Sequence, residues 1–115
     1  MESTSTIDVL GALAQPTRLA VFRLLVRSEP GGLPSGDIAR QLDVPHNTMS
    51  SHLAILERAG LVSGQRSGRS MIYHAGVEAI RDLVLFLLDD CCNGRPELCV
   101  PVREALAAAP RNCCS

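Results

Sequence analysis

The five cysteines are the side chains best suited to chemistry in this 115-residue chain, and all of them lie in its last quarter. They form two adjacent pairs and one single residue: Cys91, Cys92, Cys99, Cys113 and Cys114. In a reducing compartment, thiols grouped in this way favour soft-metal binding or redox chemistry over a disulfide framework. The residues themselves leave both chemistries open.

A second group of polar side chains lies in mid-chain, within a segment that has the periodicity of an amphipathic helix. Met49, Leu53 and Leu56 fall at i, i+4 and i+7, so they share one helical face. The opposite face and its flank carry small, polar or basic residues: Asn47, Ser51, Ala54 and Arg58, with Thr48 and His52 on the flank. Such a face suits hydrogen bonding in the major groove of DNA, although an ordinary solvated surface helix has the same pattern.

The residues before and after this segment predict a helix-turn-helix. Residues 35–42 have the pattern of a shorter helix, with Ser35 or Asp37 as its cap, and a turn of about three or four residues follows. Gly60 stands where the second helix should end. Two helices joined in this way place the second one in a major groove.

A β-hairpin is expected directly after the second helix, with strands at residues 61–66 and 70–74 around a tip at 67–69. Its arginines lie in a stretch without acidic residues, and a basic hairpin in this place predicts a winged helix whose arginines reach the DNA backbone or the adjacent minor groove. We therefore expect DNA contacts from six residues: Asn47, Thr48, Ser51, His52, Arg66 and Arg69. For His52, packing at the edge of the core is the alternative.

Three further helices should complete the fold. Apolar spacing predicts helices at residues 4–14, at 17–27 with Pro16 in the first turn, and at 77–90, and residues 29–34 are expected to form a loop. The helix at 77–90 is apolar nearly all round, so it must be buried on more than one side. We expect its extra face, together with the first helix, to pack on a second copy in a homodimer; packing wholly within one protomer is the alternative.

Composition agrees with a mainly α fold that has a small β-hairpin wing, because hydrophobic residues make up 46% of the chain and aromatic residues only 3%. The net charge of −1 is unfavourable for DNA binding. However, the acidic residues Glu78, Asp82, Asp89 and Asp90 cluster in the C-terminal third, away from the expected DNA face. We expect a winged-helix domain over residues 1–92 and a cysteine-containing tail over 93–115.

The sequence also excludes some classes of function. No run is long enough to span a membrane, and the N-terminus lacks the order of a signal peptide, so a cytoplasmic location without membrane contact is expected. No nucleophile triad, metal-bound water or phosphate cradle is evident, which argues against an enzyme. Double-stranded operator DNA is the expected partner.

Three stretches resemble the ArsR/SmtB family of small dimeric winged-helix repressors. They are Ala14-Gln15-Pro16-Thr17-Arg18-Leu19, then the run from Met49 to Val62, then the arginine-containing hairpin ending Ile72-Tyr73-His74. The resemblance covers roughly residues 5 to 90. It implies that the apo dimer binds its operator and that a metal or metalloid releases it.

The inducer site is also implied by this resemblance. Cys91, Cys92 and Cys99 resemble the variant arsenic sensors whose three thiolates lie at the end of the last helix, so trivalent arsenic, as arsenite or an organoarsenical, is the expected inducer. Thiolates are soft ligands of the kind such a centre prefers.

Other sensing sites of the family are missing, since Pro34 and Gly36 replace one cysteine pair and no histidine follows His74. A thiol-based redox or zinc-responsive regulator remains the alternative. Cys113 and Cys114 could supply further ligands or cap the site from the partner subunit. The remaining alternative is that they have no role in sensing.

Overall fold

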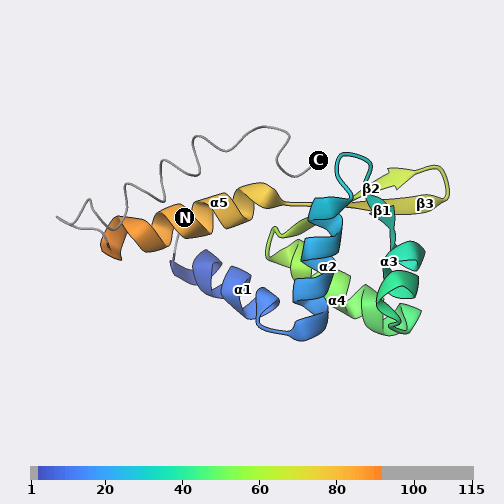
Figure 1. The fold of residues 1–115 in the computed structure, drawn as a ribbon, viewed down its shortest axis with the longest axis horizontal. Coiled ribbons are helices and arrows are strands. Elements are labelled where there is room, and N and C mark those ends of the chain that lie inside the picture. Colours follow the sequence, from blue (N-terminus) through green and yellow to red (C-terminus); the bar gives the residue numbers. More distant parts are fainter. Residues whose placement is uncertain (1–2, 92–115) are drawn as a thin grey trace.

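Within residues 3–91, which are those described by the computed structural model, five helices and a three-stranded antiparallel sheet form a winged helix-turn-helix (Figure 1). The elements in chain order are α1 (Ser3–Leu13), α2 (Pro16–Arg27), β1 (Leu33–Pro34), α3 (Ser35–Leu42), α4 (His46–Arg58), β2 (Val62–Ser67), β3 (Ser70–Ala75) and α5 (Val77–Cys91). The expected class, mainly α with a small β wing, is confirmed. The expected tail at 93–115 lies outside the described residues.

Both helices of the helix-turn-helix end at a residue in the left-handed conformation, and the next N–H donates to a carbonyl five residues back. At the end of α4, Gly60 adopts a φ of 81° and the Leu61 N–H donates to the Leu56 carbonyl over 2.9 Å. At the end of α3, Asp43 adopts a φ of 54° and the Val44 N–H donates to the Ala39 carbonyl over 3.0 Å. Glycine enters the left-handed region without cost, and aspartate is one of the few other residues that tolerate it. The predicted stop at Gly60 is confirmed.

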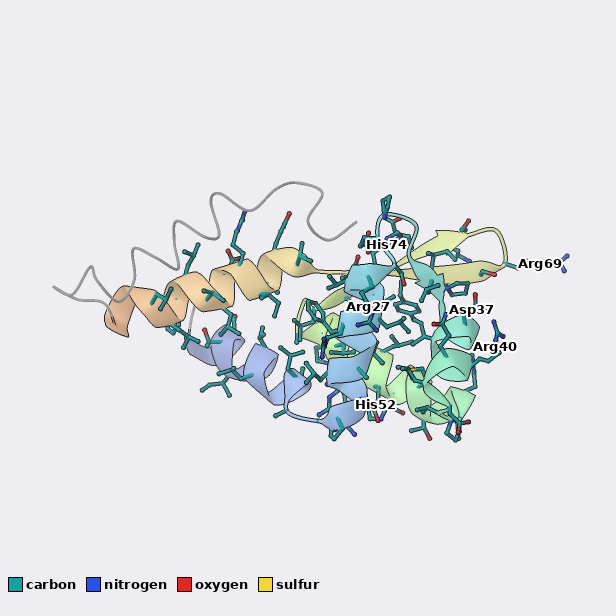
Figure 2. All side chains as sticks on the ribbon, viewed as in Figure 1. Arg27, Asp37, Arg40, His52, Arg69 and His74 are labelled. Carbon is teal, nitrogen blue, oxygen red and sulfur yellow. The ribbon has the colours of Figure 1, made fainter. Side chains whose placement is uncertain are left out.

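Two local predictions were wrong. Residues 33–34, expected within a loop, form the short strand β1, which pairs with β3 through Leu33↔Tyr73 and Pro34↔Ile72. Neither Ser35 nor Asp37 caps α3, because the cap position is Pro34 and no side chain bonds there. Asp37 instead forms an exposed ion pair with Arg40 (Figure 2). A two-residue strand has no periodicity that a sequence pattern could reveal.

The hydrophobic core lies between α2, the helix-turn-helix and the base of the wing. Its largest fully buried side chains come from all these elements and from α1: Val9, Val21, Leu25, Ile38, Met49, Leu53, Leu56 and Leu61. Helix α5 contributes Leu83, which is 6% exposed. The core therefore fixes the helix-turn-helix firmly and holds α5 by a smaller contact.

Helices α1 and α5 lie together at one end of an elongated molecule with extents of 51 × 30 × 23 Å (Figure 1). Four apolar side chains on these two helices are substantially exposed: Ile7, Leu10, Val77 and Leu87. The wing and the helix-turn-helix occupy the other end. Four of the seven exposed large apolar side chains in the described part therefore lie on α1 and α5.

In the described part of the chain, no single helix is long and apolar enough to cross a membrane. Helices α1 and α2 are long and apolar enough for a membrane span only when they are counted together, and they are bent by 97° at the break between them.

Candidate nucleic-acid interface

Helix α4 turns its two faces toward different surroundings. Met49, Leu53 and Leu56 are at most 1% exposed, so the predicted apolar stripe anchors the helix in the core. The opposite face is exposed along its whole length: Asn47, Ser51, Ala54 and Arg58. Burial of the stripe therefore fixes which residues α4 presents outward, and these are the ones that the periodicity predicted.

Polar groups at the start of α4 remain available to a ligand. The Asn47 carboxamide oxygen accepts the Thr48 N–H over 2.9 Å, which leaves the Asn47 amino group directed at no protein acceptor among the described residues. The Ser51 hydroxyl donates to the Asn47 carbonyl over 3.4 Å, so its oxygen can still accept. Asn47, Thr48 and Ser51 are all exposed. These positions suit contacts to bases or phosphates.

His52 lies on the flank of α4 that faces α1 and α2, near the foot of α2 (Figure 2). Its Nδ1 is 3.4 Å from the Arg18 guanidinium. Because a guanidinium can only donate, this contact is a hydrogen bond only in the tautomer that carries its proton on Nε2. The His52 ring is half-buried, which agrees with the alternative that it packs at the edge of the core. A DNA contact by His52 stays a prediction, and Nε2 is the atom that could make it.

Arg18 is a positioning residue that the sequence did not single out. Its Nε donates to the Ala12 carbonyl over 2.7 Å and its Nη2 to the Gly11 carbonyl over 3.4 Å, so it satisfies the C-terminal end of α1. Together with the contact to His52, this links α1, α2 and α4. In the sequence, Arg18 was notable only as part of the stretch from Ala14 to Leu19 that resembles the ArsR/SmtB family.

The wing presents its arginines to solvent. Arg66 and Arg69 are exposed, and neither forms an ion pair with another residue in the described part of the chain. Arg69 projects from the tip between β2 and β3 (Figure 2). Arg58 at the end of α4 is exposed as well and borders a cavity of about 160 Å³ together with Asp8, Ile55 and Ala59. These unpaired cations can meet phosphates.

The base of the wing is held by close backbone contacts. The Gly76 N–H donates to the Leu61 carbonyl over 2.7 Å, and a Cβ on Gly76 would lie 2.2 Å from the Gly60 carbonyl oxygen. The Glu57 carboxylate accepts the Gly64 N–H over 3.2 Å. Burial, and secondarily the charge of Glu57, raises the pKa of Tyr73 above its usual value. The wing thus begins at a fixed place relative to α4.

The loop before β1 is bound to the far end of β3. Both carboxylate oxygens of Glu29 lie 3.3 Å from His74 Nδ1, and one of them accepts the Ala75 N–H over 2.9 Å. A Cβ on Gly32, whose φ is 73°, would lie 2.6 Å from the Tyr73 carbonyl oxygen. This close approach brings β1 alongside β3 and joins the start of the helix-turn-helix to the wing.

Most of the predicted thiol cluster lies outside the described residues. Cys91 is the last residue of α5, whereas Cys92 and Cys99 fall beyond the described part. Across the residues that are described, no group of three or more His, Cys, Asp or Glu side chains could hold a metal ion.

Comparison with known proteins identifies the same regions. A helix-turn-helix domain model matches residues 13–65. The transcriptional repressor SdpR of Bacillus subtilis is 29% identical over 79% of this chain and 98% of its own length. The probable mercury resistance operon repressor of Streptomyces lividans is 32% identical over 80% of this chain and 78% of its own. The repressor SmtB of Mycobacterium tuberculosis is 36% identical over 68% of this chain, and the match covers 56% of SmtB.

Solved structures share the fold. The homodimeric winged helix-turn-helix domain of Mb0332 from Mycobacterium bovis, a possible ArsR-family regulator, superimposes with a TM-score of 0.62 at 26% identity, covering 78% of this chain and 82% of that one. A possible transcriptional regulator for arsenical resistance gives 0.61 at 28% identity, with 74% and 84% covered. The fold of this chain is thus shared with a domain described as DNA-binding.

Proposed function

Because the chain belongs to the ArsR/SmtB family of winged helix-turn-helix transcriptional repressors, we propose that it binds operator DNA as a homodimer and is released by trivalent arsenic. The observation that carries the DNA contact is the exposed polar face of α4, which lies opposite a stripe that is at most 1% exposed. In this proposal, Asn47, Thr48 and Ser51 contact bases or phosphates in the major groove.

The wing supplies the second set of contacts. Arg66 and Arg69 meet the DNA backbone or the adjacent minor groove, since they are exposed and free of ion pairs with the other described residues. His52 can contact DNA only through its Nε2 atom, because its Nδ1 faces Arg18. The local excess of arginine on the wing offsets the net charge of −1, because phosphate contacts depend on nearby cations.

Dimerisation is proposed through α1 and α5. Ile7 is 66% exposed and Val77 is 52% exposed, and Leu10 and Leu87 add apolar surface on the same two helices. A second copy that covers this surface would place two α4 helices on one side of the assembly, as a two-fold operator requires. The homodimeric state of Mb0332 supports a homodimer.

Arsenic is proposed as the inducer, with Cys91, Cys92 and Cys99 as its ligands. Their donor chemistry fits, because trivalent arsenic is thiophilic and thiolates are soft. Cys91 ends α5, the helix that bears part of the proposed dimer surface, so a ligand held there can act on the dimer. The likeness to a possible regulator for arsenical resistance and to a probable mercury resistance repressor supports a soft inducer.

The DNA contacts are tested by fluorescence anisotropy with labelled DNA from upstream of the chain's own gene. Asn47→Ala should weaken binding about tenfold, which is the cost of one lost base contact. Leu19→Ala is the matched control, because it truncates an exposed side chain on α2, outside the proposed contacts. Equal binding by the two variants would remove Asn47 from the interface.

The inducer is tested by titrating the same complex separately with arsenite, mercuric ion, zinc and peroxide. Release by arsenite that is lost in Cys91→Ser and kept in Cys114→Ser supports the proposed site. A coupling free energy of about 1–3 kcal/mol would weaken DNA binding about 5- to 150-fold. Unchanged release from Cys91→Ser overturns the ligand assignment, and release by zinc or peroxide instead of arsenite overturns the inducer.

A further inference from the structure

The orientation of the wing depends on a short stretch of chain at its base. Along β2, Val62 is 2% exposed and Gly64 is half-buried, whereas residues 65–67 are exposed. The opposing start of β3 is exposed at Ser70 and Met71. The tip of the hairpin is therefore exposed, and its direction is set by contacts nearer the base. These are the pairing of β1 with β3, the hydrogen bond between Glu29 and Ala75, and the contacts at Gly64.

One of these contacts comes from the recognition helix itself. Glu57 lies in the last turn of α4, and its Oε2 accepts the Gly64 N–H over 3.2 Å. Strand β2 is an edge strand with β3 on one side only, so its outward N–H groups have no strand partner. A charged acceptor makes this hydrogen bond stronger than a neutral one would. The side chain thus joins the DNA-reading helix directly to the wing.

The surroundings of Gly64 show that the strand passes close to its neighbours at this point. A Cβ on Gly64 would lie 3.1 Å from both the Met71 sulfur and Tyr73 Cε1. Burial, and then the charge of Glu57, raises the pKa of Tyr73 above its usual value. Glu57, Gly64 and Tyr73 therefore form one junction between α4 and the two long strands of the wing.

We infer that Glu57 is a positioning residue that fixes the angle between the recognition helix and the wing. The strand extends about 10 Å from Gly64 to Ser67, so a tilt of about 10° at Gly64 moves the tip by about 2 Å. A displacement of that size exceeds the tolerance of a hydrogen bond. Glu57 thereby decides whether α4 and the arginines of the wing can bind one DNA site together.

This inference rests on the proposed DNA contacts of the wing, but its geometric part is tested without DNA. Residual dipolar couplings of the amides of residues 62–75 report the orientation of the wing relative to α4. They should change together in Glu57→Ala and stay close to the wild-type values in Glu57→Gln, which keeps an oxygen acceptor. Amide exchange at Gly64 should be faster in Glu57→Ala only. Unchanged couplings and exchange in Glu57→Ala overturn the inference.

The DNA consequence is measured by comparing the same two variants, which carry the same charge and differ in the acceptor. Glu57→Ala should bind the operator about five- to tenfold more weakly than Glu57→Gln. Its dependence on salt should also be shallower by about one to two counterions, because each lost phosphate contact lowers the slope by about 0.9. A purely structural role would leave this slope unchanged.

A double-mutant comparison links the effect to the wing. Arg69→Ala should cost about tenfold in affinity when Glu57→Gln is the background and less than about threefold in the Glu57→Ala background. Equal costs in both backgrounds overturn the positioning role while leaving the proposed DNA contact of Arg69 intact. No cost in either background, or in the wild type, contradicts the wing contacts of the proposed function instead.

Discussion

Helices α4 and α5 both carry apolar stripes, yet the protomer buries them to very different extents. In α4, Met49, Leu53 and Leu56 are at most 1% exposed. In α5, Leu83 is 6% exposed, whereas Val77 and Leu87 are 52% and 42% exposed. The chain's own core therefore completes the apolar face of α4 and leaves that of α5 incomplete.

This difference in burial assigns different roles to the two helices. A helix whose inner face is fully buried has one rotation about its axis, so the polar residues of α4 point outward in a fixed set. A helix with exposed apolar surface gains free energy when a second copy covers it. In the proposed function, α4 is therefore ready to read DNA in each protomer, whereas α5 gains stability when the dimer forms.

The largest effect should follow from a cavity beneath α4. Leu53→Ala removes a side chain that is 1% exposed and should lower the free energy of unfolding by about 3 kcal/mol. Urea denaturation measures the change. Ile55→Ala, at an exposed position of the same helix, should change it by less than about 1 kcal/mol. Similar losses in the two variants would contradict the view that the core completes α4.

A smaller effect should appear at the other end of the molecule. Leu10→Glu puts a charge on the exposed face of α1 and should raise the dimer dissociation constant about 30-fold, or about 2 kcal/mol. Sedimentation equilibrium measures the constant. The matched control is Leu19→Glu on α2, because Leu19 and Leu10 are 44% and 45% exposed. If both substitutions dissociate the dimer equally, the interface is not confined to α1 and α5.

The smallest effect should report how firmly α4 is joined to the wing. Burial, then the charge of Glu57, raises the pKa of Tyr73, so the folded state favours the neutral phenol. Its contribution to stability is complete below the unfolded-state pKa, near 10, and is lost as the pH rises through the higher folded-state pKa. Wild-type stability should therefore fall more steeply above about pH 10 than that of Tyr73→Phe.

Urea denaturation from pH 8 to pH 11 measures this difference, and comparison of the two proteins cancels the titration of the cysteines. Because the chain has one tyrosine, phenolate absorbance follows the titration of Tyr73 directly. Parallel pH profiles for wild type and Tyr73→Phe would show that the ring is not held in the environment described for the junction.

Much of the fold could be predicted because it depends on short-range pattern. The apolar spacing in α4 located its buried face, and residues 35–42 were predicted as the helix that α3 forms. Gly60 was predicted as the end of α4 and adopts a φ of 81°. These features follow from hydrogen bonds and side-chain contacts a few residues apart, which the local sequence specifies.

The contacts that join separate elements could not be predicted. Arg18 lies against His52 across 34 positions, and the Glu29 carboxylate accepts the Ala75 N–H across 46. An arginine or a glutamate has many acceptable partners in a sequence, and only chain packing selects one. The DNA contacts remain predictions. The thiolate site does too, and its residues Cys92 and Cys99 lie outside the described part.

The sequence by itself determined, to within a few residues, which residues form α4 and the wing, because helical period, glycine stops and turn residues are local properties. Tertiary structure decided that α4 is fixed by its own core while α5 keeps exposed apolar surface, that Leu33–Pro34 pairs with β3, and that Glu57 joins α4 to the wing. These outcomes depend on which distant groups meet when the chain packs, and their free energies come from burial and hydrogen bonding that no single segment possesses.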